Sequence, residues 1–371
     1  MIWQCPASGA LLHWMAEADV EGLNCRIASG AAQRVDGTPL DRPVQAALVT
    51  PDATTAYVVE DGVLMMLPSM AISLTPGDME GGSRPGFARS KQEVRDFYNE
   101  TGWQSSDDGV YADTALFEDQ RQVSAEYNHK TRLRVGRHLD ADGELLLDIA
   151  SGPVQFPEYR SYSDQYRIRI CADFSLQALR EARKRLGEHG VYVLCDITRI
   201  PLRAESVDGF VSLHTIYHVE SSEQIEAFRE LGRVLRPGRH GVVVYTWAFP
   251  APLMAPFHPI GTAKRLVKKI VPASVMQAVR GWRRSGGLEQ PGLYFAPHTY
   301  KWVQQNLVRP YGIELHCWRS VTLTFQRRFI RSGVGGAAIL GAIYRLEDAY
   351  PRLFGRIGQY PMFVFRKTDS D

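Results

Sequence analysis

Five apolar runs separated by helical stretches follow one another from residue 144 onward, and this alternation restricts the fold more than any other feature of the chain. The runs are ELLLDIA, YRIRICADF, GVYVLCDI, VDGFVSLHTI and HGVVVYTWA, and the stretches between them include LQALREARKRLGEH and SSEQIEAFRELGRVLRPG. Parallel strands need crossover connections, which are usually helices. The pattern therefore predicts an α/β fold with a doubly wound parallel sheet that carries helices on both faces.

The chain extends this sheet at both ends. A helix in PHTYKWVQQNLVR and strands in IELHCW and QYPMFVFRK follow the five units, and we expect helical insertions at about 249–292 and 320–358. Two helices are expected before the sheet, one from Ser90 in SKQEVRDFYNETGW and one over about 118–138. At 371 residues the chain is long enough for two structural units.

The amino-terminal part differs from the repeating region. TTAYVVEDGVLMMLP has apolar runs on both sides of a turn, which is typical of paired strands. The stretch 75–89 is rich in glycine, proline and charge and reads as a linker. We therefore predict a small β-rich domain over residues 1–80 and a second domain over 81–371.

The composition indicates a cytoplasmic protein. No apolar run approaches the length that crosses a bilayer, and early acidic residues (Glu17, Asp19) interrupt any secretory signal. The five cysteines are odd in number and scattered, which favours a reducing compartment over a disulfide framework. The pattern leaves the oligomeric state open.

The charge balance bears on partners. Lys and Arg number 43 against 41 Asp and Glu, a net charge of +2, so we expect no nucleic-acid partner unless a local basic patch exists. The segment 262–284 has seven cationic residues, no acidic residue and an apolar stripe. This is typical of a segment that makes peripheral contact with an anionic membrane. The alternative is an insertion whose apolar side packs on the core.

The strand ends carry the residues that point to a nucleotide-like cofactor. LLLDIASGPVQ places Gly152 at a turn into a helix, where the backbone can approach a ligand and the helix terminus favours an anion. The second strand ends at Asp173, where a carboxylate can accept hydrogen bonds from both ribose hydroxyls. The third ends at Asp196 and Ile197, suited to an adenine amino group and ring. The first turn lacks the G-x-G-x-x-G of a dehydrogenase, and no P-loop lysine pattern is present.

With LLLDIASGP, CADFS, CDITRIPL, SLHTIYHV and RVLRPG in this order, about residues 90–250 resemble the class I (Rossmann-like) S-adenosylmethionine-dependent methyltransferases. The likeness is strongest to small-molecule enzymes of the ubiquinone and menaquinone type. It implies S-adenosylmethionine as cofactor and a small-molecule, hydrophobic or lipid-like acceptor. An RNA methyltransferase and a catalytically inactive cofactor-binding protein are the alternatives. The implied cofactor site consists of Tyr98, Tyr127, Asp148, Ala150, Ser151, Gly152, Asp173, Phe174, Asp196, Ile197 and His214.

Two positions depart from the family pattern, and two histidines are candidates for catalysis. Ala150 and Val154 stand where glycine is commoner in the family. His214 and His218 follow the fourth strand, at the edge where the ligand crevice of such a sheet lies. If the acceptor must lose a proton, we predict His218 as the first choice of base and His214 as the second. The alternative role for either histidine is a hydrogen-bonded wall residue.

The amino-terminal unit is similar to the zinc-ribbon-like domain that precedes the catalytic domain of some bacterial methyltransferases, rRNA guanine methyltransferases included. The likeness rests on CPASGALL, LNCRIASG and DGVLMMLP. A tetrahedral zinc site needs four ligands, but Ser8 and Ala28 stand at the second positions of the two C-x-x-C patterns, which leaves Cys5 and Cys25. We therefore predict a degenerate domain and no metal site.

Overall fold

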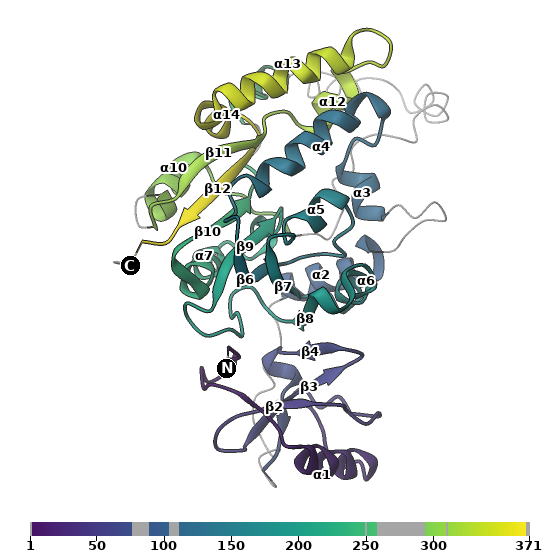
Figure 1. Cartoon of the computed structure of the whole chain (residues 1–371). Coiled ribbons are helices and arrows are strands. Elements are labelled where there is room, and N and C mark those ends of the chain that lie inside the picture. Colours follow the sequence, from purple (N-terminus) through teal and green to yellow (C-terminus); the bar gives the residue numbers. More distant parts are fainter. Residues whose placement is uncertain are drawn as a thin grey trace, which may run out of the picture.

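A mixed sheet of 12 strands runs through the computed structural model, which describes residues 2–75, 89–103, 111–248, 251–257, 294–308 and 311–368. Its centre is five parallel strands in the spatial order β8 (Gly190–Leu194), β7 (Tyr166–Asp173), β6 (Gly143–Ile149), β9 (Val207–Leu213) and β10 (Leu235–Val244). Beyond β10 follow two antiparallel strands, β12 (Tyr360–Arg366) and then β11 (Glu314–Arg319). These are the strands that the apolar runs predict (Figure 1).

Successive side chains of a strand point to opposite faces of the sheet. The central strands therefore contribute apolar side chains to both faces. On β6, Leu147 and Ile149 join the core that contains α7 (Gln224–Val234), whereas Leu146 packs on the other face with Val135 of α4 (Gln122–Gly136). The helix α6 (Leu176–Leu186) packs with residues of β7 and β8 on that second face. Helices therefore cover both faces, and the predicted doubly wound α/β class is confirmed.

The large unit also contains several shorter helices. They are α2 (Arg89–Phe97), which continues into a π-helical turn (Tyr98–Gly102), then α3 (Ala112–Phe117), α5 (Pro157–Ser161) and α10 (Tyr300–Val303) with a second π-helical turn (Gln304–Val308). The single helix expected over about 118–138 is thus preceded by the separate helix α3. None of the helices that the structure describes is long and apolar enough to cross a membrane.

The amino-terminal unit continues the sheet beyond β8. Its strands are β1 (His13–Trp14), β2 (Ala47–Val49), β3 (Thr55–Glu60), β4 (Val63–Met65) and β5 (Ile72–Ser73). The amino-terminal unit lies beside β8 (Figure 1). β4 pairs with β8 in parallel, and Trp3 and Tyr57 share one apolar core with Ile197 and Leu202. The unit and the catalytic sheet are therefore joined through both backbone pairing and a common core.

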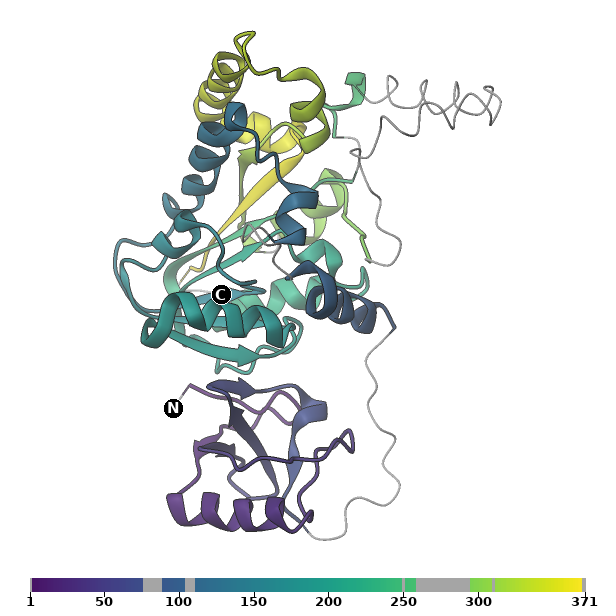
Figure 2. The same ribbon diagram turned by 90° about the vertical axis from the view of Figure 1, so that its right-hand side faces the viewer.

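The unit also contains a helix, α1 (Glu17–Ala28), which the β-rich prediction did not include. Val20, Leu23 and Ile27 of this helix are buried, at the helical spacing of i, i+3 and i+7. Polar residues separate these three positions, so the segment has no continuous apolar run that would mark it in the sequence. Figure 2 shows the helix on the side of the unit that faces away from the large sheet.

The cysteines of the unit lie in different surroundings. Cys5 is buried, with its Sγ 3.4 Å from the hydroxyl of Tyr57, whereas Cys25 is exposed on α1. In the described ranges no group of three or more His, Cys, Asp or Glu side chains is arranged to hold a metal ion. The zinc-ribbon-like resemblance itself stays a prediction.

We expect the protein to fold without zinc, because two of the four ligands of the zinc-ribbon pattern are replaced. The check is metal analysis of protein purified without chelator, with a Cys5→Ser, Cys25→Ser double variant as the control. Stoichiometric zinc in the parent that disappears in the double variant would contradict this expectation.

The expected insertion at 320–358 forms three helices between β11 and β12. They are α12 (Leu323–Phe329), α13 (Gly336–Ala349) and α14 (Pro351–Ile357). α13 packs along α4, and Arg134 of α4 pairs with the buried Glu347 of α13 at 2.8 Å (Figure 1). Of the other expected insertion, only 251–257 are described, so the basic segment 262–284 and its membrane role lie outside the described residues.

Candidate functional site

Loops of the central sheet meet at one edge, beyond the carboxyl ends of β6, β7, β8 and β9. The strand order reverses at β6, because β7 and β9 lie on its two sides and their helical connections cover opposite faces. Such a reversal leaves a crevice outside the strand ends, where α/β sheets bind ligands. Most of the predicted cofactor residues, and both histidines, lie on these loops.

The loop after β6 keeps the backbone that glycines favour. Ala150, Gly152 and Val154 have φ values of 56°, 57° and 50°, in the left-handed region. A β-branched residue is strained there. The side chain of Val154 is buried in the apolar core, and this burial offsets part of the strain. Ala150 and Val154 therefore adopt a backbone conformation that glycine would adopt without strain.

Asp173 joins this loop to the start of α6. Its Oδ2 accepts a hydrogen bond from the N–H of Gly152 and its Oδ1 one from the N–H of Ser175, both at 2.8 Å. Burial raises the pKa of Asp173 to about 6, although these two bonds oppose the shift. Each carboxylate oxygen can accept a further bond, so Asp173 retains acceptor capacity for hydroxyl donors.

Two aromatic rings cover the loop. Tyr98 stacks on Trp103 with 5.2 Å between the ring centroids, and a Cβ on Gly152 would come within 3.2 Å of the indole. Trp103 Nε1 is buried and has no hydrogen-bond partner in the described ranges. Glycine, a carboxylate acceptor and an unused N–H donor therefore lie together, and this set fits a ligand that carries ribose hydroxyls and a carboxylate.

The predicted adenine loop is held by a residue that the sequence did not indicate. Asp196 Oδ1 accepts from the N–H and the hydroxyl of Thr198, and its Oδ2 lies 2.6 Å from Lys91 Nζ on α2. Lys91 also pairs with Glu223 at 3.0 Å. Burial alone would lower the pKa of Lys91, but these carboxylates raise it. The segment SKQEV carries no motif that distinguishes Lys91 from a surface lysine. Ile197 lies next to Asp196 and is almost buried.

Three further predicted residues make contacts of their own. Asp148 is 2% exposed and pairs inside the sheet with Arg169, whose Nε lies 3.1 Å from Oδ2. Burial raises the pKa of Asp148, and Arg169 opposes that shift. Tyr127 donates to Glu347 at 2.7 Å, and Phe174 packs partly buried beside the α6 core. Asp148 and Tyr127 are thus engaged by Arg169 and Glu347, and the cofactor roles of all three residues stay predictions.

His218 is held in one tautomer. Its Nδ1 lies 2.7 Å from the carbonyl oxygen of Tyr294, which only accepts, so Nδ1 carries the proton and Nε2 keeps a free lone pair. Burial lowers the pKa of His218 to about 4, so the ring is neutral at pH 7. Its ring lies 6.5 Å from that of Tyr98. The geometry leaves Nε2 as a hydrogen-bond acceptor near the covering rings.

His214 lies in a wall of aromatic rings. Its ring centroid is 4.4 Å from that of Trp318 and 5.6 Å from that of Tyr360. Burial and the nearby charge of Arg319 lower its pKa to about 3. Its backbone φ of 59° is strained for a non-glycine residue, and such strain is common at functional sites.

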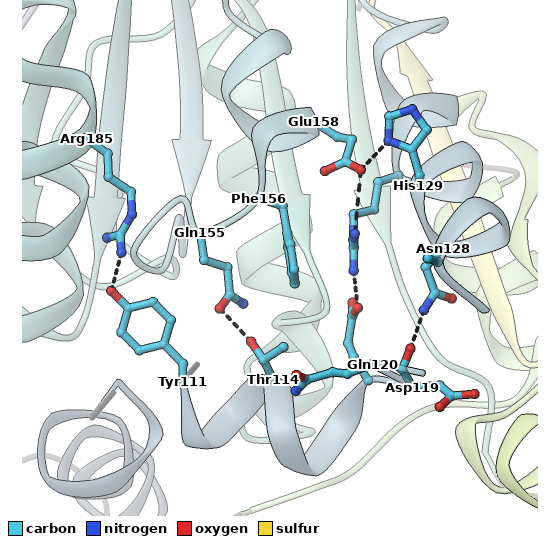
Figure 3. Close-up of a pocket in the computed structure, with 13 residues that line it drawn as sticks. Tyr111, Thr114, Asp119, Gln120, Asn128, His129, Gln155, Phe156, Glu158 and Arg185 are labelled. Atoms are coloured by element: carbon cyan, nitrogen blue, oxygen red, sulfur yellow. Dashed lines mark hydrogen bonds and ion pairs between the residues drawn. The ribbon is translucent and has the colours of Figure 1, made fainter. Parts of the chain in front are cut away.

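A polar cavity of about 320 Å³ lies beside the same loop, between α3, α4 and α5 (Figure 3). Thr114 donates to Gln155 at 2.6 Å, and Glu158 accepts from His129. Near this cavity on α3, burial raises the pKa of Asp113 to about 7. Sequence reasoning missed Asp113, since an aspartate in the first turn of a helix is ordinarily a surface residue.

Comparisons with known proteins agree with this site. Residues 147–243 match the family model described as a methyltransferase domain. A tRNA (carboxymethyluridine(34)-5-O)-methyltransferase ALKBH8 of Mus musculus is 33% identical over 85 residues, 23% of this chain and 10% of that protein. A "Probable tRNA methyltransferase 9B" of Homo sapiens is 29% identical over 140 residues, 38% of this chain and 28% of that protein. The chain thus spans less than a third of either relative.

Solved structures of low sequence identity are also similar to part of the chain. The phosphoethanolamine N-methyltransferase 2 of Haemonchus contortus, in complex with S-adenosyl-L-methionine, has a TM-score of 0.44 and is 15% identical. The match covers 81% of this chain and 63% of that one. The specific resemblance to ubiquinone-type enzymes stays a prediction.

The expectation of no nucleic-acid partner is wrong. The curated relatives are named as tRNA methyltransferases. That expectation came from the net charge of +2, which sums the whole chain and so does not report a local basic surface. Charge balance therefore gives no ground for excluding nucleic acid.

The matched domain includes most of the five parallel strands and the loops that hold Gly152, Asp173 and Asp196. A turn that fits a carboxylate-bearing ligand and an acceptor that fits ribose hydroxyls both lie within the matched residues. The chain therefore contains a methyltransferase domain over residues 147–243.

Proposed function

We propose that the acceptor is a small molecule that binds at the carboxyl edge of β9 to β11, against the ring wall of His214, Trp318 and Tyr360. The supporting observation is how closely this wall is enclosed. Trp318 is 2% exposed, and Arg134 of α4 donates to its carbonyl oxygen at 2.8 Å. An acceptor group that reaches these rings has to be slender and partly apolar.

On this proposal the cofactor is held by the loop that the covering rings close. Asp173 accepts from the ribose hydroxyls, Gly152 lets the backbone approach, and Trp103 Nε1 donates to the carboxylate. Bound S-adenosylmethionine supplies an electrophilic methyl group. The chain then contributes by orienting the acceptor and excluding water, which suffices for most of the rate in a direct displacement.

An acceptor that must lose a proton needs a base as well. His218 Nε2 is the group that the geometry favours, because its ring is neutral and Nδ1 is already bound to Tyr294. The same pattern of a histidine with one nitrogen fixed and the other free is common in general bases. His214 is the second choice, as a wall residue with no such fixed tautomer.

A nucleoside of tRNA is the second candidate acceptor, and the curated relatives favour it. A base in RNA would have to leave its stack to reach the enclosed wall, where rings of this kind can hold it. The two candidates differ in the size of the molecule that carries the methyl group, and this difference is easy to measure.

The deciding experiment supplies methyl-labelled S-adenosylmethionine and purified enzyme to an extract of a strain that lacks the gene. RNA, lipid and small-molecule fractions are then separated and counted. Label in the lipid or small-molecule fraction supports the first candidate. Label that ribonuclease releases from the RNA fraction supports the second and overturns the first. An Asp173→Ala variant gives the background.

We expect Asp173→Ala to weaken S-adenosylmethionine binding about 5- to 150-fold, since a hydrogen bond to a charged group contributes about 1–3 kcal/mol. Because the pKa of Asp173 is raised to about 6, the carboxylate protonates as the pH falls through that value. Parent affinity should therefore fall below pH 6. Asp173→Asn, which does not titrate, should be flat from pH 5 to 8. Calorimetry with equal affinity in the parent and Asp173→Ala would remove Asp173 from the site.

A further inference from the structure

Arg319 is a buried cation at the carboxyl end of β11. The residue is 3% exposed, and its Nε has no hydrogen-bond partner among the residues that the structure describes. It pairs across the sheet with Tyr360, the first residue of β12. This position lies at the sheet edge where the loops of the cofactor site and the ring wall of His214 also lie.

The other buried arginines of the described part of the chain differ from Arg319. Each of them has a carboxylate partner: Arg34 has Glu60, Arg132 has Glu118, Arg134 has Glu347, and Arg169 has Asp148. Arg319 makes no ion pair with any carboxylate in the parts of the chain that the structure describes, and no hydrogen bond from its guanidinium to a described residue is found. A buried charge without a partner is costly, so it is uncommon without a function.

Two aromatic rings hold the guanidinium without neutralising it. Its carbon lies 4.7 Å from the ring centroids of both Trp318 and Tyr360. A cation–π contact is weaker than the desolvation cost of the charge, so these rings position the group and leave its charge uncompensated. The same two rings border His214. Arg319 therefore lies next to the ring wall that is the candidate acceptor site.

We propose that Arg319 is an anion subsite for the methyl acceptor, and that it binds a carboxylate or phosphate group of that molecule. The inference rests on the proposed function, because it locates the acceptor at the ring wall. A planar guanidinium presents paired N–H donors that match the oxygens of either group. The acceptor then carries an anionic group, and the apolar rings contact the part of the molecule next to it.

The first test measures anion binding without turnover. Sodium phosphate, sodium acetate and sodium chloride are titrated at matched ionic strength, and binding is followed by thermal shift. Phosphate or acetate should stabilise the parent more than chloride does. Arg319→Gln should weaken that binding about 10- to 100-fold. Arg352→Gln, which removes an exposed arginine paired with Glu314, should bind as the parent does.

The preferred anion distinguishes the two sources. Selective stabilisation by phosphate indicates a phosphate ester, and selective stabilisation by acetate indicates a carboxylate. Equal effects of all three salts, or anion effects that persist in Arg319→Gln, overturn the proposal.

A second test measures thermal stability, because the loss of an unpaired buried arginine and the loss of a paired one should change the Tm differently. Arg319→Met should leave the Tm unchanged or raise it by up to about 4 °C, since it removes an uncompensated buried charge. Arg134→Met, which strands Glu347, should lower the Tm by at least about 6 °C. A loss in Arg319→Met as large as that in Arg134→Met would make Arg319 a structural residue and overturn the subsite.

The labelled products separate this inference from the proposed function. Methylated small molecules that an anion exchanger retains support both. Label that appears only in neutral small molecules overturns the subsite and leaves the proposed function standing. Label found only in RNA overturns the small-molecule proposal, and the anion titration then decides whether Arg319 binds phosphate.

Discussion

Asp148→Ala should lower the free energy of unfolding by about 3–5 kcal/mol, because it leaves the charge of Arg169 uncompensated inside the sheet. Asp148 is 2% and Arg169 1% exposed, and the pair joins β6 to β7 in the middle of the fold. Few single changes in the chain remove a partner from so enclosed a charge. Chemical denaturation of the parent and the variant gives the difference directly.

The same two strands supply the matched control. Glu144 on β6 and Arg167 on β7 pair at 3.2 Å, but their side chains are 64% and 76% exposed. Glu144→Ala should therefore change stability by less than about 1 kcal/mol. A double variant, Asp148→Leu with Arg169→Met, should recover most of the loss, since no charge is then left unpaired. An Asp148→Ala cost as small as that of Glu144→Ala would mean that Arg169 finds water or another acceptor.

His218→Ala should lower turnover about 10²- to 10⁴-fold if the acceptor has to lose a proton, with cofactor affinity almost unchanged. The pKa of His218 is lowered to about 4, so the ring is neutral above about pH 5 and base function is lost only as the pH falls through 4. Turnover at saturating acceptor should thus be flat between pH 6 and 8. The measurement is the pH profile of turnover for the parent, His218→Ala and His214→Ala.

The pH profile of turnover also tests Asp113 as an alternative base. Asp113 has a pKa raised to about 7, so a reaction that depends on its carboxylate would rise in rate through that pH. Turnover that rises through pH 7 and vanishes in Asp113→Asn would move the base from His218 to α3. If His218→Ala and His214→Ala both keep the parent's turnover and pH profile, neither histidine is the base.

Much of the fold could be predicted because it depends on local patterns. The five apolar runs became β6 to β10, and the turn at Gly152 and the acceptor Asp173 lie where strand ends meet. Both follow from periodicity and from the geometry of parallel sheets. Helix α1 was missed because its apolar stripe is only three residues, separated by polar ones.

The contacts that were missed depend on residues far apart in the chain. Lys91 meets Asp196, and Tyr127 meets Glu347 more than two hundred residues away. No spacing in the sequence encodes such pairs. Arg319 had no signal either, because an arginine at the end of a strand is ordinarily exposed. Only the folded structure shows that it is buried and makes no ion pair with a carboxylate of the described residues.

The parallel pairing of β4 with β8 has a consequence for how the chain is made. Val63 pairs with Tyr192, so the amino-terminal unit leaves the ribosome long before its partner strand exists. During that interval the edge of β4 is open, and Trp3 and Tyr57 lack the cover that Ile197 and Leu202 later provide. A nascent chain that stalls or is cut before β8 should therefore aggregate through this edge. In the complete chain β8 pairs with β4 and the edge is no longer open.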